Sequence, residues 1–173
     1  MNFVTLADFD KLPYSIPAGD IESTDFVEFM TAAEEDVLRK FFGHVFYDLL
    51  IANALYLPEQ KWVDLVDGAY YIYSGVTYKW VGLNKMLVPY LYFMRTRVTL
   101  DTHTVNGIET AKVENAIKKS PRQRLANAYN AFGKAYGVCK NQKESLYGFI
   151  ITNLADYENF IYKDPKLLTP YGL

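Results

Sequence analysis

The stretch from Lys61 to Thr96 reads KWVDLVDGAYYIYSGVTYKWVGLNKMLVPYLYFMRT, and it predicts a short helix, an aromatic hairpin and a long helix in direct succession. The runs Ala69–Tyr73 and Val76–Trp80 are strand-like and are joined by Ser74-Gly75 alone, the length of a two-residue hairpin loop. Strand alternation places six residues on one face: Ala69, Tyr71, Tyr73, Val76, Tyr78 and Trp80. The other face carries Tyr70, Ile72, Thr77 and Lys79. Because a lone two-stranded ribbon is marginal in water, the hairpin must pack on helices or meet a neighbour's sheet.

Helical spacing of apolar residues predicts the rest of the regular structure. The expected helices are 24–41, 44–56, the short turn 58–66, 83–98, 121–139 and 143–162. Gly43 is a natural stop for the first helix, the second is apolar nearly all round, and Ser120-Pro121 is a cap and first-turn pair. Pro89 predicts a kink in one helix rather than two helices. The fold class is therefore mainly α, a bundle of about five helices with a small β-hairpin insertion.

At 173 residues, half of them apolar, the chain fits one domain, 1–173. We expect an extended N-terminal arm at 1–22, a helical core at 23–162 that carries the hairpin 69–80 and a polar loop 101–119, and a C-terminal tail at 163–173. The tail has two prolines and no pattern, which predicts a segment that is free in the monomer unless a neighbour holds it.

The composition limits the classes of function that fit this chain. The net charge of −2 argues against a surface built as a whole to grip nucleic acid or an anionic membrane, and no run approaches the length of a membrane span. The single cysteine fits a reducing compartment, so we expect a soluble, cytoplasmic protein. Fifteen tyrosines suit either an aromatic core or a surface that becomes buried in a complex, and composition alone weighs these two interpretations equally.

Catalytic and metal-binding groups are scarce, which predicts a protein that is not an enzyme and holds no cofactor or metal. His44 and His103 lack the spacing of a metal pair, and Cys139 on an apolar helix face is favoured as a core residue over a nucleophile. The acidic run Glu34–Asp36 is interpreted as a solvated face, since Glu35 and Asp36 precede Arg39 and Lys40 by four residues.

One basic cluster stands out in the loop that leads into the 121–139 helix. Cations are disfavoured at a helix start, so this placement could serve phosphates or an acidic partner, although a solvated basic loop is the favoured interpretation. The cluster consists of Lys112, Lys118, Lys119, Arg122 and Arg124.

The order of these signals resembles a known family. The segments FFGHVFYDLL, KWVDLVDGAYY, YKWVGLNKMLVPYLYFMRT, RLANAYNAFGKAYG and LYGFI resemble the head-tail connector or adaptor proteins of tailed bacteriophages and prophages, in particular a branch from phages of gut bacteria. The resemblance covers about 26–162, and its motifs are packing and turn motifs rather than catalytic ones. Pro89 departs from the straight helix expected of the family.

The resemblance implies a structural subunit of the virion neck, assembled in the cytoplasm of the bacterial host. Its partners would be the portal protein, tail or neck proteins and copies of itself, in a ring that is dodecameric on the portal, with the isolated subunit able to remain a monomer. The five basic residues could then make transient contact with DNA in the channel. The expected contact residues lie in the hairpin and the tail: Tyr70, Tyr71, Ile72, Tyr73, Tyr78, Trp80, Leu167, Leu168 and Tyr171.

Two other functions remain open from the sequence. A small helical DNA-binding or regulatory protein would use the basic segment 112–124. An enzyme would need a histidine brought beside Cys139 and an acid by the fold.

Overall fold

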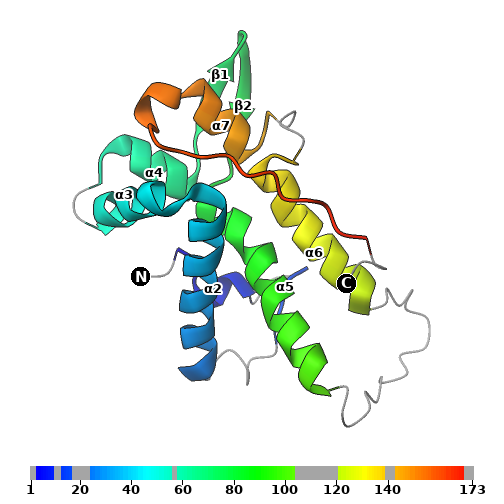
Figure 1. Cartoon of the computed structure of the whole chain (residues 1–173). Coiled ribbons are helices and arrows are strands. Elements are labelled where there is room, and N and C mark those ends of the chain that lie inside the picture. Colours follow the sequence, from blue (N-terminus) through cyan, green and yellow to red (C-terminus); the bar gives the residue numbers. More distant parts are fainter. Residues whose placement is uncertain are drawn as a thin grey trace.

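The structure is a computed structural model that describes residues 3–9, 13–16, 24–55, 58–103, 121–138 and 143–169. Within these residues, six α-helices and one antiparallel two-stranded hairpin form the regular structure, together with short 3-10 turns. Figure 1 shows the hairpin standing out from a helical body. The predicted fold class, mainly helical with a hairpin insertion, is confirmed.

Three helices make the body. α5 (Leu83–His103) packs most extensively against α6 (Pro121–Tyr136) and also contacts α2 (Thr24–Phe42). Aromatic rings fill the space between them: the ring centroids of Tyr90 and Phe132 lie 4.9 Å apart, and those of Phe41 and Phe132 lie 5.3 Å apart. Edge-to-face and tilted contacts of this kind add to the free energy gained from burial.

The first predicted helix boundary is confirmed at Gly43. This glycine has φ +81°, in the left-handed region that ends helices, and α3 (His44–Leu55) begins directly after it. The apolar residues of α3 are not all buried: Phe46 and Leu50 lie in the core, whereas Val45 and Leu49 on the outer flank are exposed. α3 lies at a corner of the body and contacts α2 and α4 (Gln60–Asp67), so the remaining flank faces solvent.

The hairpin has the predicted register. β1 (Tyr70–Tyr73) pairs with β2 (Val76–Lys79), and Tyr71 lies opposite Tyr78. Ser74 and Gly75 both have positive φ, as a tight two-residue turn between twisted strands requires. The predicted division of the hairpin into two faces follows from this pairing and is confirmed.

Two glycines cross at the base of the hairpin. A Cβ added to Gly68 would lie 2.5 Å from the carbonyl oxygen of Trp80, and one added to Gly82 would lie 2.5 Å from that of Val66. Between them, Ala69 and Trp80 exchange two main-chain hydrogen bonds of 3.1 and 2.8 Å. The buried indole Nε1 of Trp80 donates to the Leu65 carbonyl at 2.9 Å, so the strands are fixed to the end of α4.

Three predicted helices end at least three residues from the predicted boundary. α6 ends at Tyr136 rather than at 139. α5 continues through Pro89 as one helix, as predicted, but it ends at His103. Residues 101–103 are therefore helical rather than part of the loop, and residues 104–119 lie outside the described part of the chain.

The predicted helix 143–162 is reduced to α7 (Leu146–Thr152) and a 3-10 turn, η3 (Leu154–Asp156). The Asn153 side chain donates to the Phe149 carbonyl at the end of α7, and Asn159 at φ +73° redirects the chain. Tyr157 and Phe160 therefore reach the core from irregular chain, although their spacing imitates a helix.

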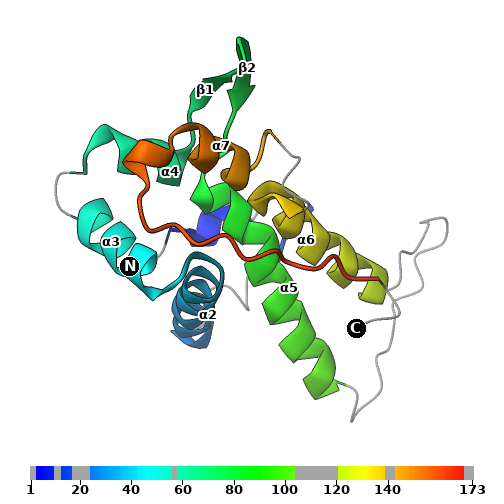
Figure 2. The same cartoon turned by 45° about the horizontal axis from the view of Figure 1, so that its top comes forward.

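The described parts of both termini pack on the body. Phe3, Val4 and Phe9 are buried, the last in the 3-10 turn η1 (Leu6–Phe9), so this part of the predicted N-terminal arm belongs to the core. The C-terminal segment crosses α5 and runs along α6 (Figure 2). There the Asn130 side chain donates to the Leu168 carbonyl at 2.8 Å and accepts from its N–H at 2.7 Å. The prediction of a free tail is therefore wrong for residues 163–169.

The glycine crossing predicts unequal costs for two alanine substitutions. Gly82→Ala combines a left-handed backbone with main-chain overlap and should lower the free energy of unfolding by about 4 kcal/mol or more, or prevent folding. Gly75→Ala is the matched control, because it has the same sign of φ and no atom within 4 Å of the added Cβ; it should cost about 1–2 kcal/mol. Urea unfolding followed by circular dichroism measures both, and equal losses would contradict the crossing.

Candidate interaction surface at the hairpin

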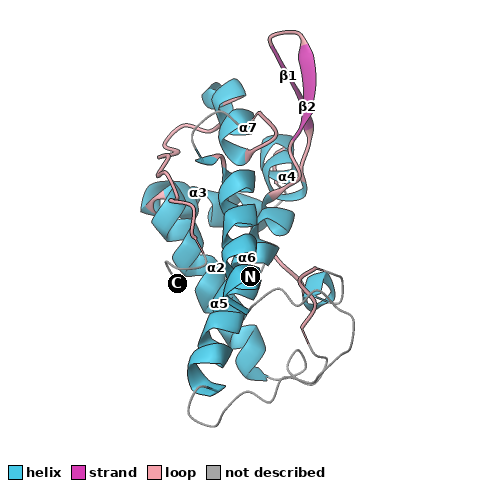
Figure 3. Cartoon of the chain, turned by 90° about the vertical axis from the view of Figure 1, so that its right-hand side faces the viewer, coloured by secondary structure: helices cyan, strands magenta, loops and turns pink. Residues whose placement is uncertain are grey.

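The hairpin carries an apolar surface that the rest of the described chain leaves uncovered. Figure 3 shows it projecting beyond α4 and α7. Tyr70 is 71% exposed, Ile72 67%, Val76 52% and Tyr73 41%. Tyr70 and Ile72 lie on one face, whereas Tyr73 and Val76 lie at the tip of the other face. Large apolar side chains are thus exposed on both faces of one short ribbon, and exposed apolar surface of this kind is typical of interaction sites. We call these four residues the hairpin surface.

The part of the inner face nearest the body belongs to the core. Tyr71 and Trp80 are buried, and both rings contact Phe149 of α7, with centroid distances of 5.5 and 6.2 Å. The prediction that Tyr71 and Trp80 belong to a partner surface is therefore wrong, because their own chain covers them. Tyr78 is half-buried and packs beside Tyr71 at 5.9 Å.

The charge carried by the hairpin is positive. Lys79 is the single charged residue of the sequence between 69 and 80, and its Nζ lies 5.4 Å from the Tyr70 ring centroid. The Nζ of Lys143 lies 4.6 Å from the Tyr73 ring centroid and 5.7 Å from that of Tyr78. The tyrosines are thus flanked by cations over their ring faces.

A cleft of about 350 Å³ lies at the foot of the hairpin, next to β1. Phe149 and Tyr157 contribute apolar surface, and Asp64 and Asp156 contribute carboxylates. The full lining is Lys61, Asp64, Ala69, Tyr70, Tyr71, Ile72, Phe149, Asn153, Asp156 and Tyr157. Sequence reasoning missed this cleft, because its walls come from segments up to 96 residues apart and share no local pattern.

The other predicted contact residues do not join the hairpin. Leu167 is exposed and Leu168 half-buried on the tail along α6, away from the hairpin, and Tyr171 lies outside the described residues. Of the basic cluster, Arg122 and Arg124 are exposed on the first turns of α6. Lys112, Lys118 and Lys119 lie outside the part of the chain that the structure describes.

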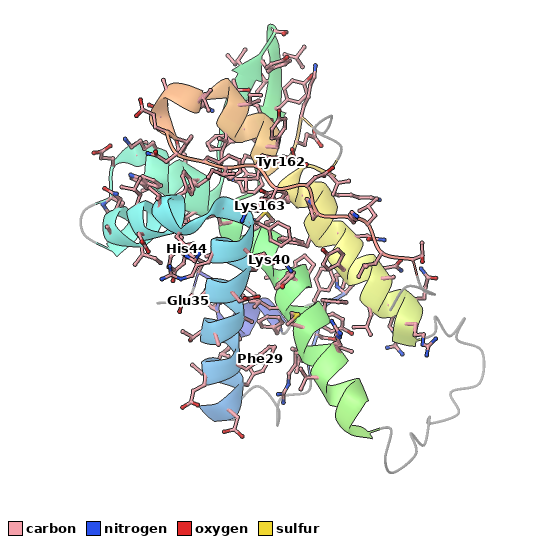
Figure 4. The ribbon with its side chains drawn as sticks, in the orientation of Figure 1. Phe29, Glu35, Lys40, His44, Tyr162 and Lys163 are labelled. Carbon is pink, nitrogen blue, oxygen red and sulfur yellow. The ribbon has the colours of Figure 1, made fainter. Side chains whose placement is uncertain are left out.

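The acidic run of α2 has two different roles. Glu35 forms the predicted exposed ion pair with Arg39, with Oε1 2.8 Å from Nε, near His44 (Figure 4). Lys40 instead places its Nζ over the Phe41 ring. The interpretation of Glu34 as solvated is wrong: it is 2% exposed and accepts the N–H groups of Phe3 and Val4 at 2.9 and 3.0 Å. Burial raises the pKa of its carboxyl, and the two hydrogen bonds act in the opposite direction.

The titratable groups of the described residues form no cluster of three or more His, Cys, Asp or Glu that could hold a metal ion. His44 is exposed, and its Nδ1 lies 3.2 Å from Nη1 of Arg39. The side chain of His103 and all of Cys139 lie outside the described structure. None of the helices in the described ranges has the length and apolarity that a bilayer crossing needs.

Comparisons with known proteins find no relative. No protein-family model matches the chain, and neither the curated proteins nor the solved structures contain a match.

Removal of the side-chain hydroxyl should have different effects on the free energy of unfolding at Tyr71 and at Tyr136. The Tyr71 hydroxyl is buried with no hydrogen-bond partner among the described residues, and burial raises its pKa to about 12. The Tyr136 hydroxyl donates to the Phe41 carbonyl at 2.9 Å and accepts the Lys163 N–H at 3.2 Å. Tyr71→Phe should leave the free energy of unfolding unchanged or raise it by about 1 kcal/mol, whereas Tyr136→Phe should lower it by about 1–3 kcal/mol.

Urea unfolding of the two variants beside the wild type makes this comparison. A loss for Tyr71→Phe as large as that for Tyr136→Phe would show that the Tyr71 hydroxyl has a partner.

Proposed function

We propose that this chain is a structural subunit of the head-tail connector of a tailed bacteriophage, an adaptor that forms a ring between the portal and the tail. The observation that carries the proposal is the hairpin surface: Tyr70, Ile72, Tyr73 and Val76 are uncovered on a ribbon that is fixed to the body at its base. Such a surface suits assembly rather than catalysis. The order of sequence segments that resembles connector proteins supports the same role.

A ring needs two different surfaces on each subunit, because its interfaces are heterologous. The hairpin surface supplies one. The exposed flank of α3, where Val45 and Leu49 lie beside Asp48, offers a second surface on another side of the body. In this proposal the protein acts without catalysis or a cofactor, its partners are the portal and tail or neck proteins, and it resides in the virion neck.

In this proposal, contact with DNA is a secondary role of the subunit. Arg122 and Arg124 are exposed at the start of α6 and could meet passing DNA in a channel. The alternative of a dedicated DNA-binding protein stays a prediction from the sequence, since three of its five basic residues lie outside the described chain.

Reconstitution with a portal tests the proposal. The full chain is co-expressed with the portal protein of the same phage, and negative-stain images are examined for a ring of added density beneath the portal. The wild type should form it. The double variant Tyr70→Ser with Ile72→Ser should fold and fail to form the ring, because it removes exposed apolar area from the hairpin surface and leaves the core side chains unchanged.

The matched control is Val27→Ser with Val98→Ser, which removes exposed apolar side chains from α2 and α5 and should leave the ring intact. Absence of any association between wild type and portal at every salt concentration would contradict the connector role. A ring that forms equally well with the hairpin double variant would contradict the role of the hairpin surface.

A further inference from the structure

The outer edge of β1 is an unpaired strand edge. Ala69 and Trp80 exchange both main-chain hydrogen bonds, so by alternation Tyr71 with Tyr78 and Tyr73 with Val76 are the bonded pairs. The N–H and C=O groups of Tyr70 and Ile72 consequently point away from β2. Within the described residues, no main-chain hydrogen bond from Tyr70 or Ile72 reaches another segment. An edge of this kind is a template for an added strand.

The cleft lies along this edge rather than elsewhere on the hairpin. Its lining includes four consecutive residues, Ala69 to Ile72, and none of β2. The opposite walls come from α4 and from the α7–η3 segment, with Phe149 and Tyr157 between them. Its volume of about 350 Å³ falls at the lower end of the range of about 300–1,000 Å³ for ligand sites.

The charge around the cleft is negative. Asp64 and Asp156 line it, and the cation there, Lys61, is already paired through its Nζ with Glu59 at 2.9 Å. The pKa of Lys61 is raised, first by that hydrogen bond, with Asp156 and Glu158 acting in the same direction. A segment that enters the cleft would therefore gain from positive charge and lose from negative charge.

We propose that the edge of β1 and its acidic cleft bind an extended basic peptide segment, which adds to the hairpin as a third strand. Main-chain hydrogen bonds to Tyr70 and Ile72 would hold the segment, alternate apolar side chains would lie beside the exposed side chains of these two residues, and lysines or arginines on its other face would meet Asp64 and Asp156. A third strand also removes the marginal stability of a two-stranded ribbon. The inference goes beyond the connector role and does not depend on it.

A synthetic probe tests the site directly. Fluorescently labelled acetyl-TKVTVKT-amide is titrated with the full chain at low salt and followed by anisotropy. Saturable binding with a Kd below about 1 mM is expected, and added salt should weaken it. The peptide acetyl-TEVTVET-amide reverses the charge, and acetyl-TKVPVKT-amide lacks the central N–H; each should bind at least about tenfold more weakly.

Protein variants locate the bound peptide. Ile72→Pro removes one outward N–H of β1 and spares the bonded pairs, and Thr77→Pro does the same on β2, away from the cleft. Binding should fall at least about tenfold for Ile72→Pro and stay unchanged for Thr77→Pro. Asp64→Asn with Asp156→Asn should also weaken it, whereas Asp48→Asn on α3 should not.

Three outcomes would overturn the inference: no saturable binding of the lysine peptide, equal binding of all three peptides, or equal loss with the two proline variants. The peptide controls need no change to the protein, so a proline variant that fails to fold leaves the test decisive.

Discussion

The structure depends on the close crossing of Gly68 and Gly82 at the base of the hairpin. Their backbones approach so closely that a methyl group on either would overlap a main-chain atom of the opposite segment, and Trp80 locks the crossing through its hydrogen bond to the Leu65 carbonyl. Two consequences follow from this one constraint. The crossing fixes the directions of α4 and α5 relative to the hairpin. It also fixes the ribbon to the body, although only part of the inner face of the ribbon is packed against other side chains. Without the crossing, a two-stranded ribbon would have little stability of its own.

The division of the hairpin into a covered and an uncovered face links fold to function. Phe149 of α7 covers Tyr71 and Trp80, which makes the inner face part of the core. The same arrangement leaves Tyr70 and Ile72 outside, with their main-chain groups along a cleft whose carboxylates come from α4 and η3. Side-chain contact on the hairpin surface and main-chain pairing at its edge are separate ways to hold a partner, and an assembling subunit could use both.

Local patterns in the sequence predicted the local structure well. Ser74-Gly75 between aromatic runs predicted the hairpin and its register, and Gly43 and Pro121 predicted helix boundaries, because the chemistry of turns and helix ends acts over a few residues. Long-range pairings were not predictable. Glu34 sits in an acidic run that looks solvated, and only the return of the N-terminal segment buries it. The tail is held by Asn130, 38 residues from Leu168, and the cleft joins segments that meet only in the folded chain.

We propose that the exposed hairpin is a contact surface in an assembled phage neck. The most direct measurement is a cryo-electron microscopy map of the neck in purified virions, at a resolution that shows strands. The account predicts copies of this chain arranged in a ring below the portal, with Tyr70 and Ile72 of each copy covered by an adjacent protein. Virions that lack this chain, or a ring in which every hairpin faces open solvent, would contradict it.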